Sequence, residues 1–349
     1  MLKIAVLYEP SDNTALALDP ARVHHKERRQ AGSQRRRRGP ERRQKLDREE
    51  VLEALRKDGY DPFFHELTNE AALLELARTK ADLIFNMVEA FAGDDAKEAH
   101  VAAFLDLLEL RYTGAGPQGL FLAQDKAIAK KIFDFHDIRT PRFAVSYRGR
   151  LDHVDDLEFP LIVKPASEDG SVGIDVGAVV HTLREMLERV ALIESKFDCP
   201  ALIEEYIEGR EIYVGVLGND KPNALPIVEL DLSKLPKDMP RIAGKEVKWE
   251  KGTEAYDVTR SAAAQGLDDS IVSRLQKTAV QVYGALKLRD YGRVDMRLAK
   301  DGRIYVIEAN PNPWLAPEAE LAMAAGLAGR SYAELIGQIV ELALARYAA

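Results

Sequence analysis

The order of apolar and polar positions in the first hundred residues predicts alternating strands and helices. Short apolar runs over 2–7, 60–67 and 82–86 have the length and composition of buried strands. Between them, apolar residues at helical spacing predict helices over 49–57 and 71–77. This β-α-β-α-β rhythm predicts an open parallel α/β layer. The first connection lacks a Gly-x-Gly-x-x-Gly sequence, so we do not infer dinucleotide binding from it.

The chain changes character after a helix predicted over 97–108. The turn-rich stretch Tyr112-Thr113-Gly114-Ala115-Gly116-Pro117 follows, and we place the first domain boundary there. Residues 233–262 are polar and poorly periodic, which predicts a long loop near a site. The remaining pattern predicts a helix over 125–136, a strand over 159–164, strands over 201–205 and 212–217 linked by a turn at Gly209, and a last helix opened by a Ser331-x-x-Glu334 capping box.

Composition and charge add one unexplained feature. With 349 residues, of which 46% are hydrophobic, the chain has material for two or three domains. The net charge is −8, but residues 21–48 hold 12 Lys/Arg against 3 Asp/Glu. This basic block is either a solvated insertion without a specific partner or a surface that could meet nucleic acid, an anionic lipid surface or an acidic ligand. It lacks aromatic side chains on which bases could stack, so nucleic acid is not the partner that we expect.

Several classes of protein are excluded by what the sequence lacks. The single cysteine, Cys199, rules out an internal disulfide framework and any multi-cysteine metal site. No window approaches the ~18–20 uninterrupted apolar residues of a membrane span. The first residues turn acidic too early for a signal peptide. We therefore expect a cytoplasmic protein that does not enter the membrane.

The strongest candidate for a chemical site is a predicted hairpin over 293–310. Two alternating runs flank Asp301-Gly302, a sequence typical of a two-residue type I′ turn. In that register Leu298 faces Tyr305, Asp295 faces Glu308, and Arg293 faces Asn310 on the same side of the hairpin. Paired carboxylates repel, and a cation between them would remove the repulsion. Two carboxylates and an amide oxygen suit Mg²⁺ or Mn²⁺, whereas the alternative is an exposed hairpin with ordinary surface charge.

Several separated motifs occur in an order that a known family shares. They are Tyr112-Thr113-Gly114, Asp125-Lys126, Gly292-Arg293-Val294-Asp295 and Tyr305-Val306-Ile307-Glu308-Ala309-Asn310-Pro311-Asn312-Pro313. In these motifs the chain resembles the ATP-grasp ligases and, more narrowly, the D-alanine–D-alanine ligases. The resemblance implies an α/β (α+β) fold in which an N-terminal open parallel α/β domain precedes two α+β subdomains that hold ATP between them. We expect boundaries at 1–116, 117–203 and 204–349.

The resemblance also implies roles for residues around the nucleotide. Asp295, Glu308 and Asn310 would hold Mg²⁺ or Mn²⁺ between the phosphates of ATP. Arg293 would stabilise the transferred phosphate and the tetrahedral intermediate. Lys126 and Lys164 match the lysines that reach the phosphates, and Gly170 and Ser171 belong to the small-residue loop that folds over them. The matches at the adenine and ribose end are Glu204, Glu205, Ile207 and Glu211, and Lys248-Trp249 resembles the Lys-Tyr pair of the family's lid, with Lys248 near the γ-phosphate.

The substrate side departs from the family. Trp314 stands where the family has a glycine that cradles the intermediate, and Ala319 where it has a serine that holds the second carboxylate. The basic block follows the first strand, where the family has its amino-acid-anchoring loop. We expect Glu89 to bind an amine, and we include Trp249, Asn312 and Trp314 in the substrate pocket.

Three readings of function follow from these residues. The first is an ADP-forming ligase that joins amino acids through an acyl phosphate, as a D-alanine–D-alanine ligase or a close relative does. The second is an ATP-grasp ligase for a different amino acid or a larger peptide or acidic substrate. The third is a non-catalytic ATP-binding partner protein. The retained Arg293, Asp295, Glu308 and Asn310 argue against the third. The resemblance also implies a homodimer.

Overall fold

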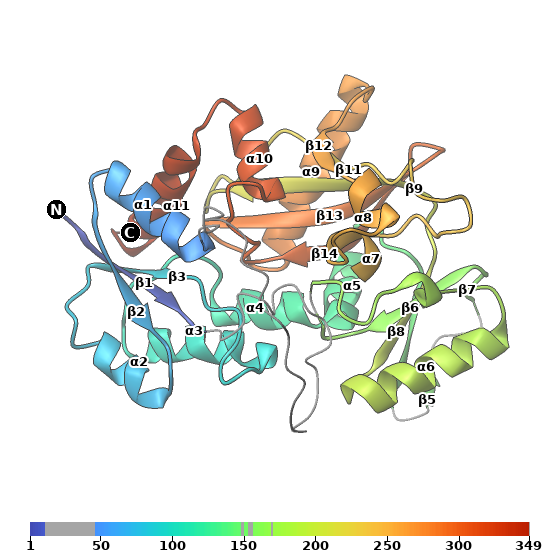
Figure 1. The fold of residues 1–349 in the computed structure, drawn as a ribbon, viewed down its shortest axis with the longest axis horizontal. Coiled ribbons are helices and arrows are strands. Elements are labelled where there is room, and N and C mark those ends of the chain that lie inside the picture. The colour runs from blue at the N-terminus through green and yellow to red at the C-terminus, as the bar shows by residue number, and fades with distance from the viewer. Residues whose placement is uncertain (11–45, 148–149, 153–155, 169, 349) are drawn as a thin grey trace, which may run out of the picture.

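The computed structural model describes residues 1–10, 46–147, 150–152, 156–168 and 170–348. The described part contains three β-sheets with helices packed on their faces (Figure 1). Residues 11–45, which hold most of the basic block and the stretch after the first strand, lie outside the described residues. Both interpretations of the basic block therefore stay predictions from the sequence.

The N-terminal layer is a three-stranded parallel sheet in the order β2-β1-β3. Ile4 and Val6 pack among residues of the first helix, whereas Ala5 and Leu7 pack among residues of the next two. Both faces of the central strand are therefore covered, which explains its continuous apolar run. The predicted β-α-β-α-β order is confirmed by β1 (Lys3–Tyr8), α1 (Asp47–Lys57), β2 (Asp61–Glu66), α2 (Glu70–Leu76) and β3 (Leu83–Asn86), after which comes α3 (Glu98–Leu107).

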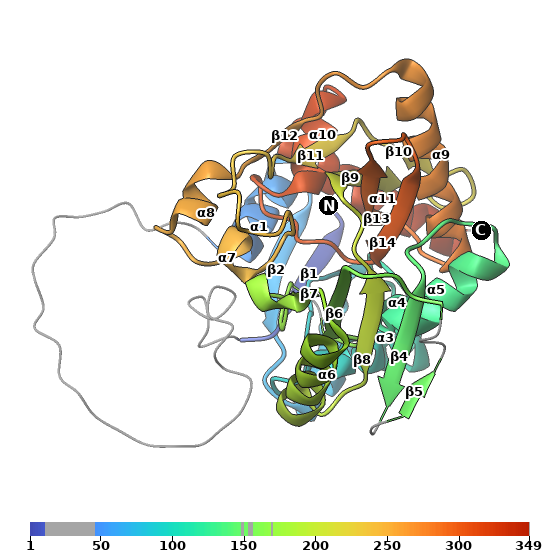
Figure 2. The same cartoon turned by 90° about the vertical axis from the view of Figure 1, so that its right-hand side faces the viewer.

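The second layer is a five-stranded antiparallel sheet in the order β5-β4-β8-β6-β7. Helices α4 (Pro117–Gln124) and α5 (Lys126–Phe135) lead into it, and the Asp125 side chain caps α5 by accepting a hydrogen bond from the Ile128 amide at 2.9 Å. Helix α6 (Leu183–Phe197) lies along one face of the sheet (Figure 2). The strands are β4 (Phe143–Tyr147), β5 (Arg150–Asp152), β6 (Leu161–Pro165), β7 (Val179–Val180) and β8 (Ala201–Glu205).

The third layer is a six-stranded antiparallel sheet in which β12-β11-β9-β13-β14 lie side by side and β10 pairs with β9. One face is apolar, because Ile212, Val214 and Val294 pack with residues of α9 (Asp269–Ala285). The other face carries the polar residues of the predicted site. The strands are β9 (Gly209–Leu217), β10 (Asn223–Ala224), β11 (Val228–Leu230), β12 (Ser261–Ala263), β13 (Tyr291–Ala299) and β14 (Ile304–Asn310).

Two expectations for the middle of the chain are wrong. Strands β8 and β9 belong to different sheets, and Gly209 is the first residue of β9 rather than a turn between them. An added Cβ at Gly209 would collide with the backbone of Leu298, so a close strand contact explains this glycine. Residues 233–262 are not one loop, because they contain α7 (Lys245–Lys248) and α8 (Glu254–Val258). Helices of about one turn are too short to show a periodic pattern.

The last two helices return the chain to the N-terminal layer. Helix α10 (Glu320–Leu327) follows the hairpin, and α11 (Tyr332–Ala348) packs against α1 in a core that includes Val51, Leu55, Ile336 and Ile339. The predicted capping box is confirmed. The Ser331 amide donates to the Glu334 carboxylate at 2.7 Å, and the Glu334 amide donates to the Ser331 hydroxyl at 3.3 Å.

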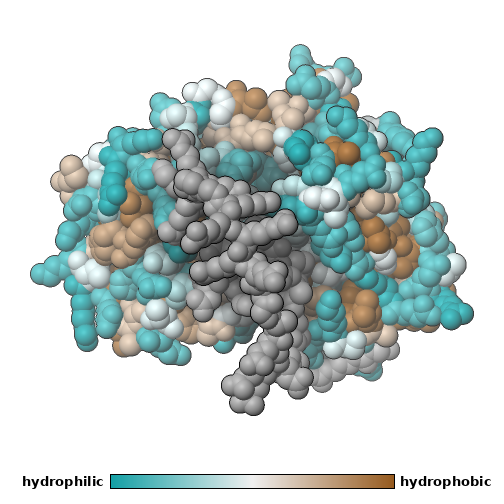
Figure 3. Space-filling view, viewed as in Figure 1, coloured by the Kyte–Doolittle hydropathy of each residue, from teal (hydrophilic) through white to brown (hydrophobic). Residues whose placement is uncertain are grey.

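The surface and the helices give no sign of a membrane segment in the described chain. None of the described helices is both long and apolar enough to cross a bilayer. Figure 3 shows a face that is largely hydrophilic, with apolar residues in small separate groups. Groups of this size are normal on a protein surface and carry no inference about a partner.

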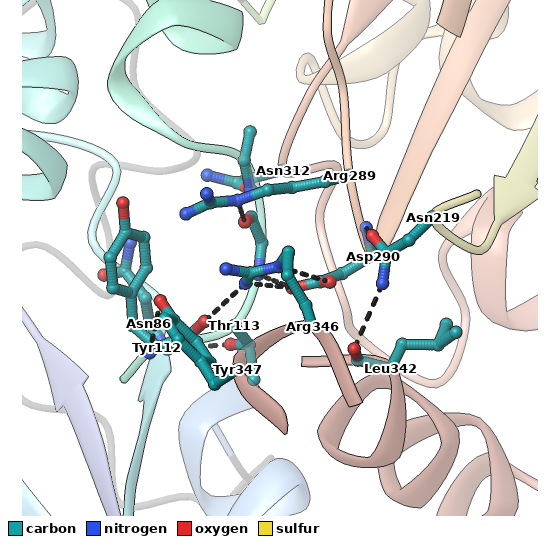
Figure 4. A network of polar contacts seen from close by, with 12 residues as sticks. Asn86, Tyr112, Thr113, Asn219, Arg289, Asp290, Asn312, Leu342, Arg346 and Tyr347 are labelled. Carbon is teal, nitrogen blue, oxygen red and sulfur yellow. Dashed lines mark hydrogen bonds and ion pairs between the residues drawn. The ribbon is translucent and has the colours of Figure 1, made fainter. Parts of the chain in front are cut away.

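A buried polar network joins α11, the start of β13 and the Tyr112-Thr113-Gly114 loop (Figure 4). Asp290 is fully buried, and its Oδ2 accepts hydrogen bonds from the Gly114 amide at 2.8 Å and from Arg346 at 2.9 Å. Arg346 also donates to the Tyr112 carbonyl at 2.8 Å. Arg289 donates to the Gly114 carbonyl at 3.0 Å. The network therefore fixes the loop of the N-terminal layer just before the hairpin that carries the site.

Replacing Asp290 by asparagine should destabilise the fold. Asp290→Asn removes the charge that Arg346 neutralises and presents an NH₂ group to donors already directed at this position. We expect the free energy of unfolding to fall by about 3 kcal/mol, seen as a lower unfolding temperature. The control is Asp301→Asn, because Asp301 pairs with Arg303 on the exposed hairpin tip. Equal unfolding temperatures for the two variants would contradict a structural role for the network.

Candidate active site

The hairpin of β13 and β14 places Asp295 opposite Glu308 and Arg293 opposite Asn310, as the sequence predicted. The turn itself differs from the prediction. The Ala299 amide bonds the Arg303 carbonyl at 2.9 Å, so three residues form the loop, with Gly302 at φ 79°. Leu298 consequently pairs with Ile304 and not with Tyr305. A bulge between Asp295 and Met296 shifts the register by one residue, which restores the predicted pairing at the acidic end.

The two opposed carboxylates lie among opposite charges. Arg293 binds Asp295 with two parallel hydrogen bonds of 2.7 and 2.9 Å and reaches Glu320, the first residue of α10, at 3.2 Å. Burial and the negative charge of Glu308 raise the pKa of Asp295. The positive charge of Arg293 and its hydrogen bonds to Asp295 act in the opposite direction. Burial also opposes ionisation of Glu308, but Lys126, Lys164 and Lys248 outweigh it and lower its pKa to about 2.

One pocket collects most of the predicted site residues. It lies where the five-stranded and six-stranded sheets meet, since its walls come from β6, β8, β9, β13 and β14. The predicted residues that line it are Lys164, Ser171, Glu204, Glu205, Ile207, Glu211, Lys248, Asp295 and Glu308. Residues far apart in the sequence therefore come together as one site, with basic groups near the acidic hairpin and apolar side chains elsewhere in the wall.

Three lysines surround the acidic hairpin. Lys164 lines the pocket at the end of β6, and Lys248 lines it at the end of α7. Lys126 lies behind the lining, 3.6 Å from a carboxylate oxygen of Glu308, and donates to the Glu168 carbonyl at 2.6 Å. A polyphosphate placed against these ammonium groups would meet positive charge from three separate elements. This arrangement is suited to holding phosphates above a pair of carboxylates.

At the end of the pocket predicted to bind adenine and ribose, the acidic residues are already paired with basic side chains. Glu204 is buried and pairs with Lys164 at 2.7 Å and with Lys130. Glu205 pairs with Arg142 at 3.0 Å. Glu211 pairs with Arg297 at 2.6 Å, and both residues line the pocket.

The sequence interpretation missed Arg297 and Lys130. Two signals in the sequence could have indicated them. Arg297 follows Arg293 and Asp295 on the alternating face of β13, and Lys130 lies one helical turn after Lys126.

The small-residue loop touches the segment that carries Lys248. The Ser171 hydroxyl donates to the Ala243 carbonyl at 2.7 Å, and the Trp249 indole N–H donates to the Gly170 carbonyl at 2.7 Å. Gly170 has φ 63° and Ser171 has φ 64°, so both residues adopt the left-handed conformation. Glycine adopts this conformation at no steric cost, which explains the glycine at 170. The loop and the α7 segment are therefore bonded to each other, and each contributes one residue, Ser171 and Lys248, to the pocket lining.

Removing the indole hydrogen bond should weaken the contact between the small-residue loop and the α7 segment. Trp249→Phe keeps an aromatic ring but cannot donate to Gly170. The loss of one exposed hydrogen bond should raise the KM for ATP about three- to tenfold and leave kcat nearly unchanged. Steady-state kinetics check this, and a fall in kcat at constant KM would show that Trp249 acts on the chemical step instead.

The four predicted substrate residues, Trp249 included, lie outside the pocket lining. Asn312 accepts a hydrogen bond from the Ala115 amide at 2.9 Å and donates to Glu98 at 2.9 Å, which ties the end of the hairpin to the N-terminal layer. The Trp314 indole donates to Asp47 of α1 at 3.2 Å. Glu89 is exposed in the segment after β3. The assignment of these residues to a substrate stays a prediction.

The residues present fit a divalent metal ion through their oxygen atoms. Asp295 and Glu308 provide opposed carboxylates, and the Nδ2 atom of the adjacent Asn310 is buried with no hydrogen-bond partner among the described residues. Turning that amide would expose its oxygen without breaking a bond to Nδ2. The described residues contain no cluster of three His, Cys, Asp or Glu side chains with metal-binding geometry. The set is therefore sparse in protein ligands, as magnesium sites that also use phosphates are.

Comparison with known proteins finds relatives along most of the chain. A family model described as the D-ala D-ala ligase C-terminus matches residues 130–341. The chain is 30% identical over 305 residues to the D-alanine–D-alanine ligase of Desulfotalea psychrophila, covering 84% of this chain and 88% of that protein. It is 34% identical over 293 residues to that of Bordetella petrii, with 83% and 84% covered. It is also 36% identical over 273 residues to a Sinorhizobium fredii protein described as uncharacterized protein y4sG, with 78% and 77% covered.

A solved structure has the same fold along nearly the whole chain. The D-alanine–D-alanine ligase of Bacillus anthracis complexed with ATP superposes with a TM-score of 0.73 at 23% identity, covering 99% of this chain and 98% of that one. Fold and site together define an ATP-grasp ligase, which confirms the predicted fold class. Within that class, the chain belongs to the D-alanine–D-alanine ligase family.

Proposed function

We propose that the protein is an ADP-forming carboxylate–amine ligase that joins amino acids through an acyl phosphate, as a D-alanine–D-alanine ligase or a close relative. The observation that carries the proposal is the pocket in which Lys164 and Lys248 meet the Asp295–Glu308 pair between two sheets. A phosphate chain placed there would lie between fixed cations and a carboxylate pair able to hold metal. The described relatives named as ligases support the same activity.

The chain's own residues account for the steps of this reaction. Lys164, Lys126 and Lys248 hold and orient the phosphates, and the Gly170–Ser171 loop covers them. The substrate carboxylate attacks the γ-phosphorus, ADP leaves, and the amine then displaces phosphate from the acyl phosphate. Arg293 donates hydrogen bonds to the oxygens that gain charge in both steps. Asp295, Glu308 and Asn310 would hold a Mg²⁺ or Mn²⁺ ion, which would neutralise the charge of the phosphates.

A substrate other than D-alanine is favoured by the residue that precedes Glu320 of α10. Ala319, just before Glu320, is buried and offers no hydroxyl to a second carboxylate. A ligase for a different amino acid or a larger peptide or acidic substrate is therefore the second candidate within the same reaction class.

Phosphate release separates these candidates. The assay combines the protein, ATP and Mg²⁺ or Mn²⁺ with a panel of D- and L-amino acids and short peptides. Release with D-alanine alone, together with formation of the dipeptide, supports the first candidate. Release with another acceptor supports the second. ATP binding without release for any acceptor would contradict the proposed catalysis and leave a nucleotide-binding partner protein.

The remaining properties belong to the same proposal. Small-molecule amino-acid or peptide substrates follow from the reaction class. We propose a cytoplasmic homodimer, with nucleic acid not among the partners. The division at 1–116, 117–203 and 204–349 is proposed as it was drawn from the sequence, and its second boundary falls within β8. Sedimentation of the purified protein tests the dimer directly.

A further inference from the structure

Lys130 of α5 is a buried charge outside the pocket lining. Its side chain is fully buried, and its ammonium group pairs with Glu204 and donates to the Thr140 hydroxyl at 2.5 Å. Thr140 in turn donates to the carbonyl of Val306, two residues before Glu308, at 2.8 Å. A buried ammonium group is costly even when it is paired. The polar contacts of Lys130 therefore link α5, β8 and β14 behind the wall of the pocket.

Glu204 is shared between two lysines. One carboxylate oxygen faces Lys130, and the other lies 2.7 Å from Lys164, which lines the pocket. All three side chains are nearly or completely buried. Two ammonium groups and one carboxylate leave a net charge of +1 at this place. If Lys130 were neutral, Glu204 and Lys164 would form a pair with no net charge.

The sharing of Glu204 between two lysines has a consequence for phosphate binding. This inference rests on the proposed binding of ATP. We propose that Lys130 is a positioning residue that occupies half of the Glu204 carboxylate and so leaves the positive charge of Lys164 available to the nucleotide phosphates. Lys130 does not touch the nucleotide itself. It acts through Glu204, because a carboxylate that is already neutralised on one side attracts the ammonium group on its other side less strongly.

The charge state of Lys130 follows from the groups that face it. Burial, together with the charge of Lys164 of β6, lowers the pKa of Lys130 to about 8, while Glu204 of β8 and Glu308 of β14 act in the opposite direction. The ammonium group is therefore largely charged at pH 7 and loses its proton as the pH rises through about 8. Alkaline solution should act on the site in the same direction as a neutral substitution.

The test is direct binding of ATP with Mg²⁺ by isothermal titration calorimetry at pH 7. Lys130→Met removes the charge and keeps a linear side chain of similar length. We expect the Kd for ATP to rise about tenfold, which corresponds to ~1.4 kcal/mol. The matched control is Lys131→Met, because Lys131 is the next residue of α5 and is exposed. Its Kd should equal that of the wild type.

A second substitution distinguishes electrostatic positioning from simple damage to the core. Lys130→Arg keeps the positive charge beside Glu204 and changes the shape of the side chain, so its ATP affinity should stay within about threefold of the wild type. A purely structural defect would instead lower the affinity in both variants. Unfolding temperatures of all variants show whether the fold persists.

The wild type also tests the proposal without any substitution. Its Kd for ATP should rise between pH 7 and pH 9.5, and the Kd of Lys130→Met should stay flat over the same range. Equal ATP affinity in Lys130→Met and the wild type at pH 7 would overturn the inference while leaving the proposed function in place. A wild type that does not bind ATP would overturn both.

Discussion

Glu308→Gln is expected to abolish turnover while the protein stays folded. The substituted amide would retain the shape of the side chain but lose the charge that opposes Asp295 and faces Lys126. Because the carboxylate pair is the proposed metal site, the loss should reduce kcat by a factor on the order of 10³ or more. Phosphate release measures the activity, and far-ultraviolet circular dichroism with thermal unfolding measures the fold.

The control for this substitution lies in the connection between β8 and β9. Glu208 is exposed and, among the described residues, pairs with Lys300 at 2.8 Å, so Glu208→Gln removes a similar charge without touching the hairpin acids. Its kcat should match the wild type. If Glu308→Gln kept wild-type activity, the metal assignment to Asp295, Glu308 and Asn310 would be wrong.

The second large effect is expected from Arg293→Lys. A lysine keeps the charge but cannot make the two parallel hydrogen bonds to Asp295 and the third contact to Glu320 at once. The donors aimed at the reacting oxygens would lose their fixed direction. We expect kcat to fall about 10²–10³-fold, with a smaller change in the KM for ATP.

Arg303→Lys serves as the matched control for Arg293→Lys. Arg303 belongs to the same hairpin, but its guanidinium is exposed and pairs with Asp301 at the tip. In steady-state kinetics, the kcat of Arg303→Lys should match the wild type, and the kcat of Arg293→Lys should be lower by the factor given above. Similar kcat values for the two variants would mean that Arg293 holds the hairpin together and does not act on the reacting groups.

The sequence alone indicated most of the elements and the central pair of the site. Alternation and an Asp-Gly turn were enough to place Asp295 opposite Glu308. The same reasoning gave the wrong turn, because a three-residue loop and a bulge each shift the register by one and their effects cancel at the acidic end. Bulges depend on the packing of the whole sheet, so local sequence does not reveal them.

The residues that were missed are those whose partners are distant along the chain. Lys130 follows Lys126 by one helical turn, yet its partner Glu204 comes from β8 and Thr140 precedes β4. Arg297 faces Glu211 of a neighbouring strand. Charged residues on amphipathic elements usually face solvent, so only the assembled sheets reveal that these two are buried. The converse holds for Asn312, whose motif suggested a substrate but whose amide ties two layers together.

The packing of α11 has a consequence for biosynthesis. Ile4, Val6 and the apolar face of α1 share one core with Leu335, Ile336 and Ile339, which follow them far along the chain. One face of the N-terminal sheet therefore stays open until α11 has left the ribosome, whereas the five-stranded sheet closes its own core with α6 much earlier. Strand β1 is therefore fully covered only after all the other described strands have been synthesised.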